Sequence, residues 1–122
     1  MSDANRLPPV VERFIAAMNS FDDAGLMATL SDDAFVNDVQ REFWGKADIA
    51  AFARRELTGP KVTMAVKSAR THYGMLALDA EIDGEFDKAN LPSPLILTFY
   101  FLIEAELIVS LFIMRNPPTP KP

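Results

Sequence analysis

The chain has 122 residues and no cysteine, 49% of its residues are hydrophobic, and its formal net charge is -5. This length indicates one domain, residues 1–122, with an ordered core expected over about residues 7–115. An acidic chain lacks the clustered lysines and arginines that phosphate binding requires, so nucleic acid is not expected as a partner. Without cysteine, disulfides, thiolate metal sites and a cysteine nucleophile are excluded.

The first half of the chain predicts three helices and one short strand. Residues 1–6 are polar and lack the apolar core of a signal peptide, so we expect a cytoplasmic protein. Pro8-Pro9 suits a first helical turn, Asp22 or Asp23 can cap the second helix, and Gly59-Pro60 stops the third. The expected helices span about residues 9–18, 23–30 and 46–57, and a short apolar strand over residues 34–38 ends at Asp38.

Beyond residue 60 the apolar period changes to two, which predicts strands over about residues 62–67, 76–83, 95–103 and 107–115. Leu95 to Met114 is apolar enough to suggest a membrane helix. Glu104 and Glu106 at its centre would make that helix costly, so two strands are expected there and no membrane partner. These strands are apolar on both faces, which predicts that one face packs on helices and the other on a second subunit, in a homodimer. The Pro-rich tail, residues 116–122, is expected to fray.

Helices followed by a long antiparallel sheet indicate an α+β domain. Residues 10–19, Asp22 and residues 30–38 resemble the opening of ketosteroid isomerases, and residues 44–49 resemble the element that begins the third helix in that group. The wider set is the nuclear-transport-factor-2-like superfamily, which includes SnoaL-like polyketide cyclases. This resemblance implies a cystatin-like cone, with three N-terminal helices packed in a curved antiparallel sheet. The motif is specific for the fold and weak for activity.

The resemblance also implies a catalytic residue. Asp38 matches the aspartate base with which ketosteroid isomerases move a proton next to a ketone. The oxyanion-binding tyrosine of that family falls at Phe14, and its second acid falls at or near Thr98. Both usual oxyanion donors are therefore replaced, so classical ketosteroid isomerisation is not expected. SnoaL-like cyclases act on a carbanion stabilised by its own conjugation and need such donors less. The alternative for Asp38 is a structural carboxylate that accepts backbone N–H groups or pairs with Arg41.

A group of mostly apolar and aromatic residues is expected to bind the substrate around Asp38. Trp44 could cover a flat ligand or pack on the third helix, and Tyr100 could supply the missing donor or lie in the core or an interface. The expected substrate-binding residues are Phe14, Met18, Phe35, Trp44, Phe52, Met64, Thr98 and Tyr100.

No cofactor or metal is expected. The sequence has no phosphate-binding glycine-rich loop, serine nucleophile elbow or dinucleotide fingerprint, and His72 stands without a cluster of ligands. The sequence therefore favours a SnoaL-like, cofactor-free enzyme of isomerase or cyclase type, with Asp38 as proton shuttle on an apolar carbonyl compound. The alternative is a non-catalytic dimeric domain that binds a hydrophobic small molecule.

Overall fold

The computed structural model describes residues 7–115, apart from the side chain of His72. The predictions for residues 1–6 and for the tail at 116–122 lie outside this range. Within it, three α-helices precede most of the sheet, in the order α1, α2, β1, β2, α3, followed by a π-helical turn and then β3 to β6. No helix among the described residues is both long enough and apolar enough to cross a bilayer.

Local sequence signals set the helices. α1 (Pro9–Asn19) begins with a proline in its first turn, and α2 (Asp23–Ala28) is capped by Asp22, whose carboxylate accepts the Gly25 N–H at 3.0 Å. α3 (Gly45–Ala53) continues into a π-helical turn, η2 (Arg54–Thr58). A single third helix was expected over these residues, and its last turn is instead π-helical. Single π-helical turns of this kind are frequent at functional sites.

The sheet has six strands in the order β2-β1-β6-β5-β4-β3. The strands are β1 (Leu30–Asp38), β2 (Arg41–Trp44), β3 (Thr63–His72), β4 (Met75–Asp83), β5 (Leu95–Glu104) and β6 (Leu107–Arg115). The period-two pattern therefore predicted that β3 to β6 are strands, and the 95–114 stretch forms two strands. β3 extends to His72, beyond the expected end near residue 67. β2 was not predicted. The sheet is mixed rather than wholly antiparallel, because β1 pairs with β6 in parallel while the other neighbours are antiparallel.

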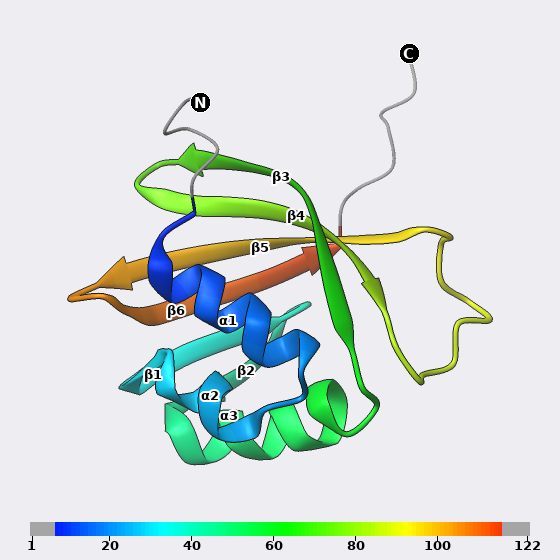
Figure 1. Ribbon diagram of the computed structural model, residues 1–122, viewed down its shortest axis with the longest axis horizontal. Helices are drawn as coiled ribbons and strands as arrows, with labels where there is room; N and C mark the ends of the chain where they lie inside the picture. The colour runs from blue at the N-terminus through cyan, green and yellow to red at the C-terminus, as the bar shows by residue number, and fades with distance from the viewer. Residues whose placement is uncertain (1–6, 116–122) are drawn as a thin grey trace.

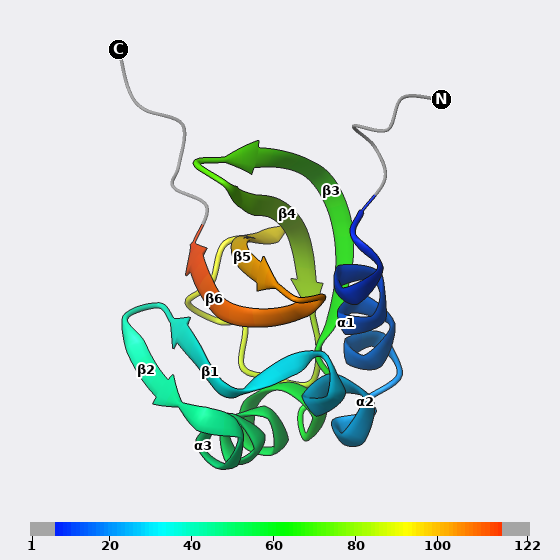
Figure 2. The ribbon, with the colours of Figure 1, turned by 90° about the vertical axis from the view of Figure 1, so that its left-hand side faces the viewer.

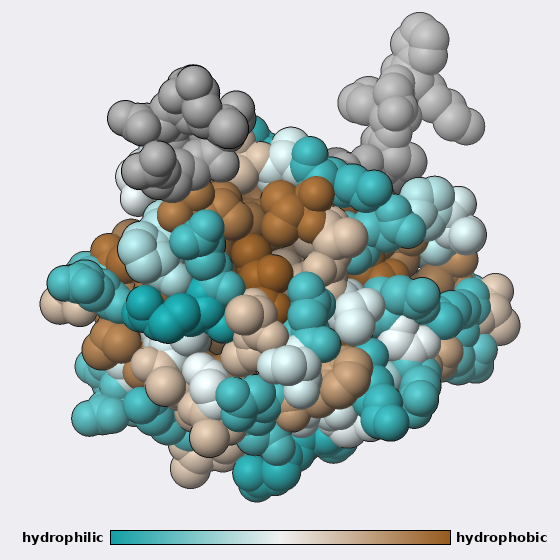
Figure 3. Space-filling view, in the orientation of Figure 1, coloured by the Kyte–Doolittle hydropathy of each residue, from teal (hydrophilic) through white to brown (hydrophobic). Residues whose placement is uncertain are grey.

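The sheet curls around its helices, as Figures 1 and 2 show, with α1 across its concave side and α3 against β1 and β2. Aromatic contacts fill the space between the layers: Phe14 meets Phe101 edge-on at 5.3 Å, and Phe43 stacks on Phe52 at 4.4 Å between ring centroids. Asn19 joins α1 to β3 through two hydrogen bonds with the Met64 backbone. In Figure 3 apolar side chains gather near the middle of the face, above α1, and polar ones surround them. The fold is the expected α+β cone.

Candidate functional site

A cavity of about 670 Å³ opens between the sheet and the α3–η2 segment. Its lining comes from most elements of the chain and from the loop between β4 and β5. The apolar lining residues are Met18, Val39, Phe52, Leu57, Pro60, Val62, Ile82, Phe86, Leu91, Leu95, Leu97, Phe99 and Ile113. Five charged residues complete it, and we call them the charged lining: Asp38, Arg41, Arg55, Glu56 and Arg115. The size and the mainly apolar walls are those of a small-molecule site.

Asp38 reaches this cavity because of its place in the pleat of β1. It lies opposite Ile113 of β6, which also lines the cavity, and side chains on one strand alternate between the two faces. The side chain of Asp38 is 17% exposed. A carboxylate is thus held at the end of a strand beside an apolar wall.

A tight turn brings Arg41 beside Asp38. Val39 and Gln40 connect β1 to β2 with φ values of 49° and 70°, and the Asn37 side chain accepts the Gln40 N–H at 2.8 Å. Positive φ at both central residues is the geometry of two-residue hairpins, and it is uncommon for a β-branched residue such as Val39. Asp38 and Arg41 therefore face each other across the turn, and an Arg41 N–H donates to the Asp38 carboxylate.

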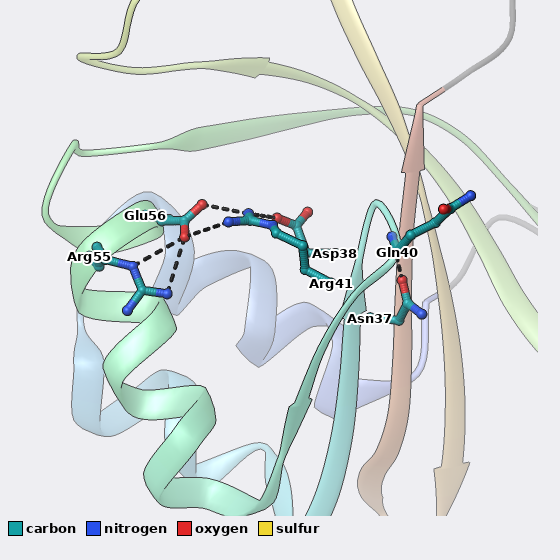
Figure 4. Close-up of polar contacts among 6 residues, drawn as sticks. All are labelled: Asn37, Asp38, Gln40, Arg41, Arg55 and Glu56. Carbon is teal, nitrogen blue, oxygen red and sulfur yellow. Dashed lines mark hydrogen bonds and ion pairs between the residues drawn. The ribbon is translucent and has the colours of Figure 1, made fainter.

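Glu56 of η2 is the second partner of Arg41, as Figure 4 shows. The two side chains form a fork, with nitrogen–oxygen distances of 2.9 and 2.6 Å. Arg55 also donates to Glu56, at 3.2 Å. The hydrogen bond from Arg41 lowers the pKa of Glu56, while hydrogen bonds to Glu56 and then Asp38 raise the pKa of Arg41. The Arg41 guanidinium also lies 5.9 Å from the centre of the Phe52 ring.

Three of the predicted site residues meet at the cavity: Asp38, Met18 and Phe52. Phe14 and Met64 face the same side of the sheet but are buried in the core outside the main cavity. Phe14 lines a small void of about 10 Å³, which Phe52 also lines. Direct contact of Phe14 and Met64 with a substrate stays a prediction.

The other four predicted substrate-binding residues lie on the outer face of the sheet. The Phe35 and Trp44 rings are 4.2 Å apart, and Phe35 also meets Phe112. Trp44 is 62% exposed. Thr98 and Tyr100 alternate along β5 with Leu97 and Phe99, which line the cavity, so they face away from it. The structure thus does not bring these four to the cavity that contains Asp38.

Asp79 and Thr98 form a polar cluster on that outer face. The Thr98 hydroxyl donates to Asp79 at 2.6 Å, and Ser68 and Arg70 donate to its other oxygen. Burial opposes ionisation of Asp79, but these hydrogen bonds outweigh it and hold its pKa below the ordinary value. Every oxygen of the cluster is engaged, so Thr98 acts there as a structural donor.

Sequence reasoning missed most of the charged lining. Arg41 was considered only as a structural partner for Asp38, and Arg55, Glu56 and Arg115 were not singled out. The signal for Arg41 was its spacing from Asp38, which fits a two-residue hairpin. Glu56 carries no such local signal, because its meeting with Arg41 depends on how η2 folds back on β2. Among the described residues no group of three or more acidic or histidine side chains could hold a metal ion.

No protein-family model and no curated protein matches this sequence. Solved structures do. A candidate polyketide cyclase from Sinorhizobium meliloti has a TM-score of 0.73 and 22% identity, over 88% of this chain and 95% of that one. Delta 5-3-ketosteroid isomerase from Mycobacterium sp. has a TM-score of 0.69 and 19% identity, over 88% and 90%. An NTF2-like protein of unknown function from Cytophaga hutchinsonii has a TM-score of 0.70 and 16% identity, over 88% of each chain. The chain therefore has the nuclear-transport-factor-2-like fold that these ketosteroid isomerase and cyclase-like proteins share.

Proposed function

We propose that this protein is a small cofactor-free enzyme that binds an apolar carbonyl compound and uses Asp38 to shuttle a proton. The chemistry would be of the isomerase or polyketide-cyclase type. The observation that supports this proposal is the position of Asp38, a little-exposed carboxylate on the wall of a mainly apolar cavity. The fold alone does not choose among activities, so the proposal depends on this site.

In the proposed reaction Asp38 takes a proton from the carbon next to the substrate carbonyl. The electron pair of the broken C–H bond moves onto the carbonyl oxygen, which becomes an enolate. Asp38 then returns the proton to a different carbon, which gives an isomer. In a cyclase the enolate carbon attacks a second carbonyl instead, and the proton goes to the new alkoxide. Arg41 donates to one oxygen of Asp38, Oδ2, and no side chain of the described residues donates to the other, Oδ1. Oδ1 is the atom we assign to proton transfer.

Arg41 is the group that we assign to the enolate oxygen. Phe14 has no hydroxyl and Thr98 faces the other side of the sheet, so neither can stabilise that charge. A guanidinium has five N–H groups, and Asp38 and Glu56 together accept from three of them. Two N–H groups remain for a ligand. A positive charge beside the developing oxyanion would lower the barrier.

Deuterium exchange tests this proposal. Cyclic ketones and 1,3-dicarbonyl compounds are incubated with the protein in D₂O, and loss of the α-proton signal is followed by NMR. We expect exchange to be at least about 10²-fold slower in Asp38→Asn than in the wild type. Asp33→Asn is the matched control, because Asp33 is an exposed aspartate of the same strand that does not line the cavity. Equal rates in Asp38→Asn and the wild type would refute the role of Asp38.

A specific observation also supports a non-catalytic binding domain. Asp38 already forms an ion pair with Arg41, as expected for a carboxylate with a structural role. If this second function is correct, the wild type binds apolar ligands without any α-proton exchange, and Asp38→Asn binds them equally well.

The outer face of the sheet supports the proposal of a homodimer. Phe35, Trp44, Phe112 and Met114 lie together across β2, β1 and β6, with Trp44 and Met114 exposed. A second copy of the chain would remove this apolar surface from water. We expect the wild type to sediment as a dimer at micromolar concentration and Phe112→Glu to sediment as a monomer. A monomeric wild type would refute the dimer.

A further inference from the structure

The cavity carries more positive than negative charge, although the whole chain is acidic. Three arginines and two carboxylates make up its charged lining, while the formal net charge of the chain is -5. Local charge of this sign, against an opposite background, favours an anionic ligand.

The excess charge belongs to one residue, Arg115. Arg41 donates to both Asp38 and Glu56, and Arg55 donates to Glu56. Arg115 forms no ion pair or hydrogen bond with a side chain of the described residues. Its guanidinium is therefore the one cationic group of the cavity that no described carboxylate neutralises.

Arg115 is exposed to solvent on one side and lies beside apolar side chains of the cavity wall on the other. It is the last residue of β6, and it lies opposite Leu97 of β5, which lines the same cavity. Ile113, two residues earlier on the same face of β6, lines the cavity as well. A neutral ligand filling this space would cover part of the guanidinium without offering an acceptor, whereas a carboxylate or sulfonate would bind it by charge-assisted hydrogen bonds.

We propose that the cavity binds amphipathic monoanions, with an apolar ring or chain against its walls and an acidic group on Arg115. This inference rests on the proposed function, because it names the ligand class of the same cavity. Asp38 and Arg41 are already paired with each other, so we place the acidic group on Arg115, the cation of the lining without a carboxylate partner among the described residues. Asp38 is in register with Ile113, and Arg115 is two residues further, roughly 7 Å along the strand. The acidic end therefore lies away from the carbon that faces Asp38.

Two fluorescent dyes test the proposal. 8-Anilinonaphthalene-1-sulfonate and N-phenyl-1-naphthylamine share one apolar skeleton and differ by the sulfonate, and both become brighter in apolar sites. They are titrated into the wild type, Arg115→Gln and Arg13→Gln. Arg13 is an exposed arginine of α1 outside the cavity, so its variant loses the same charge at a different place. Leu97→Trp, which fills part of the cavity, locates the fluorescence there, and circular dichroism verifies that each variant is folded.

We expect the wild type to bind the sulfonate dye more tightly than the neutral dye. Arg115→Gln should raise the dissociation constant of the sulfonate dye roughly three- to tenfold, because one charge-assisted contact is lost. The dissociation constant of the neutral dye should change by less than about twofold. Added salt should weaken binding of the sulfonate dye to the wild type and to Arg13→Gln. Its effect on binding to Arg115→Gln should be much smaller.

The two proposals fail in different ways. If the neutral dye binds in the cavity but the sulfonate dye responds equally to Arg115→Gln and Arg13→Gln, the assignment of Arg115 is refuted and the apolar site stands. If neither dye binds, or if Leu97→Trp leaves the binding of both unchanged, the cavity is not the ligand site. That result would refute the proposed function together with the ligand class.

Discussion

The contact between Arg41 and Glu56 should stabilise the folded protein measurably. We consider the double-mutant cycle Arg41→Gln, Glu56→Gln and the combined variant. The fork has two charge-assisted hydrogen bonds, which favours a large coupling energy, but the Arg41 and Glu56 side chains are 51% and 30% exposed, so water screens it. We therefore expect a coupling energy of about 1 kcal/mol at pH 7, at the upper end of the range for surface ion pairs. The parallel cycle with Asp38→Asn should give a smaller value, because that contact is single.

Urea unfolding followed by circular dichroism gives the four free energies. Lys67 and Glu81 provide a control cycle, since their ion pair is longer, at 3.3 Å, and both side chains are more exposed, at 53% and 43%. That pair should couple by about 0–0.5 kcal/mol. A coupling between Arg41 and Glu56 no larger than the control value would refute the reasoning. So would a coupling that is unchanged in 1 M salt, where the screening length is about 3 Å.

The sign of the pH dependence follows from the lowered pKa of Glu56. Its folded pKa lies below the ordinary value of 4.5, so the coupling is fully present above about pH 4.5 and is lost as the pH falls through the lower, folded pKa. A coupling that grows on acidification would contradict the ion pair.

Three further predictions concern stability, each measured by urea unfolding. Asn19→Ala should cost about 1–3 kcal/mol, because it leaves the Met64 backbone N–H and C=O without their partners, while Asn19→Asp should keep the N–H contact and cost less. Gly59→Ala should cost about 1–3 kcal/mol, since a Cβ there would stand 2.2 Å from the Arg54 carbonyl oxygen. Asp79→Asn should cost about 1–2 kcal/mol at pH 7 and progressively less as the pH falls below the ordinary 3.8, because the folded pKa of Asp79 is lowered. An unchanged midpoint in any of these variants would contradict the contact concerned.

The outer-face position of one predicted site residue, Phe35, was contained in the sequence. Side chains alternate along a strand, so Phe35 and Asp38, an odd number of residues apart, must face opposite sides of β1. Trp44 shares that face because it pairs with Phe35 across β1 and β2, but β2 was not predicted, so the sequence did not place Trp44. Thr98 and Tyr100 differ, since their face depends on the register of β5, which the alternation alone does not anchor.

The part of the site that could not be predicted is non-local. Phe14 and Met18 lie one helical turn apart on the same face of α1, yet only Met18 reaches the cavity. That difference depends on where each end of α1 lies on the concave side of the sheet. The contact of Glu56 with Arg41, and the parallel pairing of β1 with β6, likewise join distant segments. Periodicity predicts which residues form an element and which face is apolar, but not which elements meet.

The pairing of β1 with β6 has a consequence for how the protein folds. β1 belongs to the first third of the chain and β6 ends at Arg115, so one edge of β1 has no partner until nearly all of the polypeptide is available. Contacts that are so distant in sequence slow folding, and an unpaired strand edge can join another chain. A growing or truncated chain that lacks Leu107–Arg115 would expose that edge and aggregate. The addition of β6 therefore does two things together. It joins β1 to β5 in one sheet, and it supplies Ile113 and Arg115 to the cavity wall.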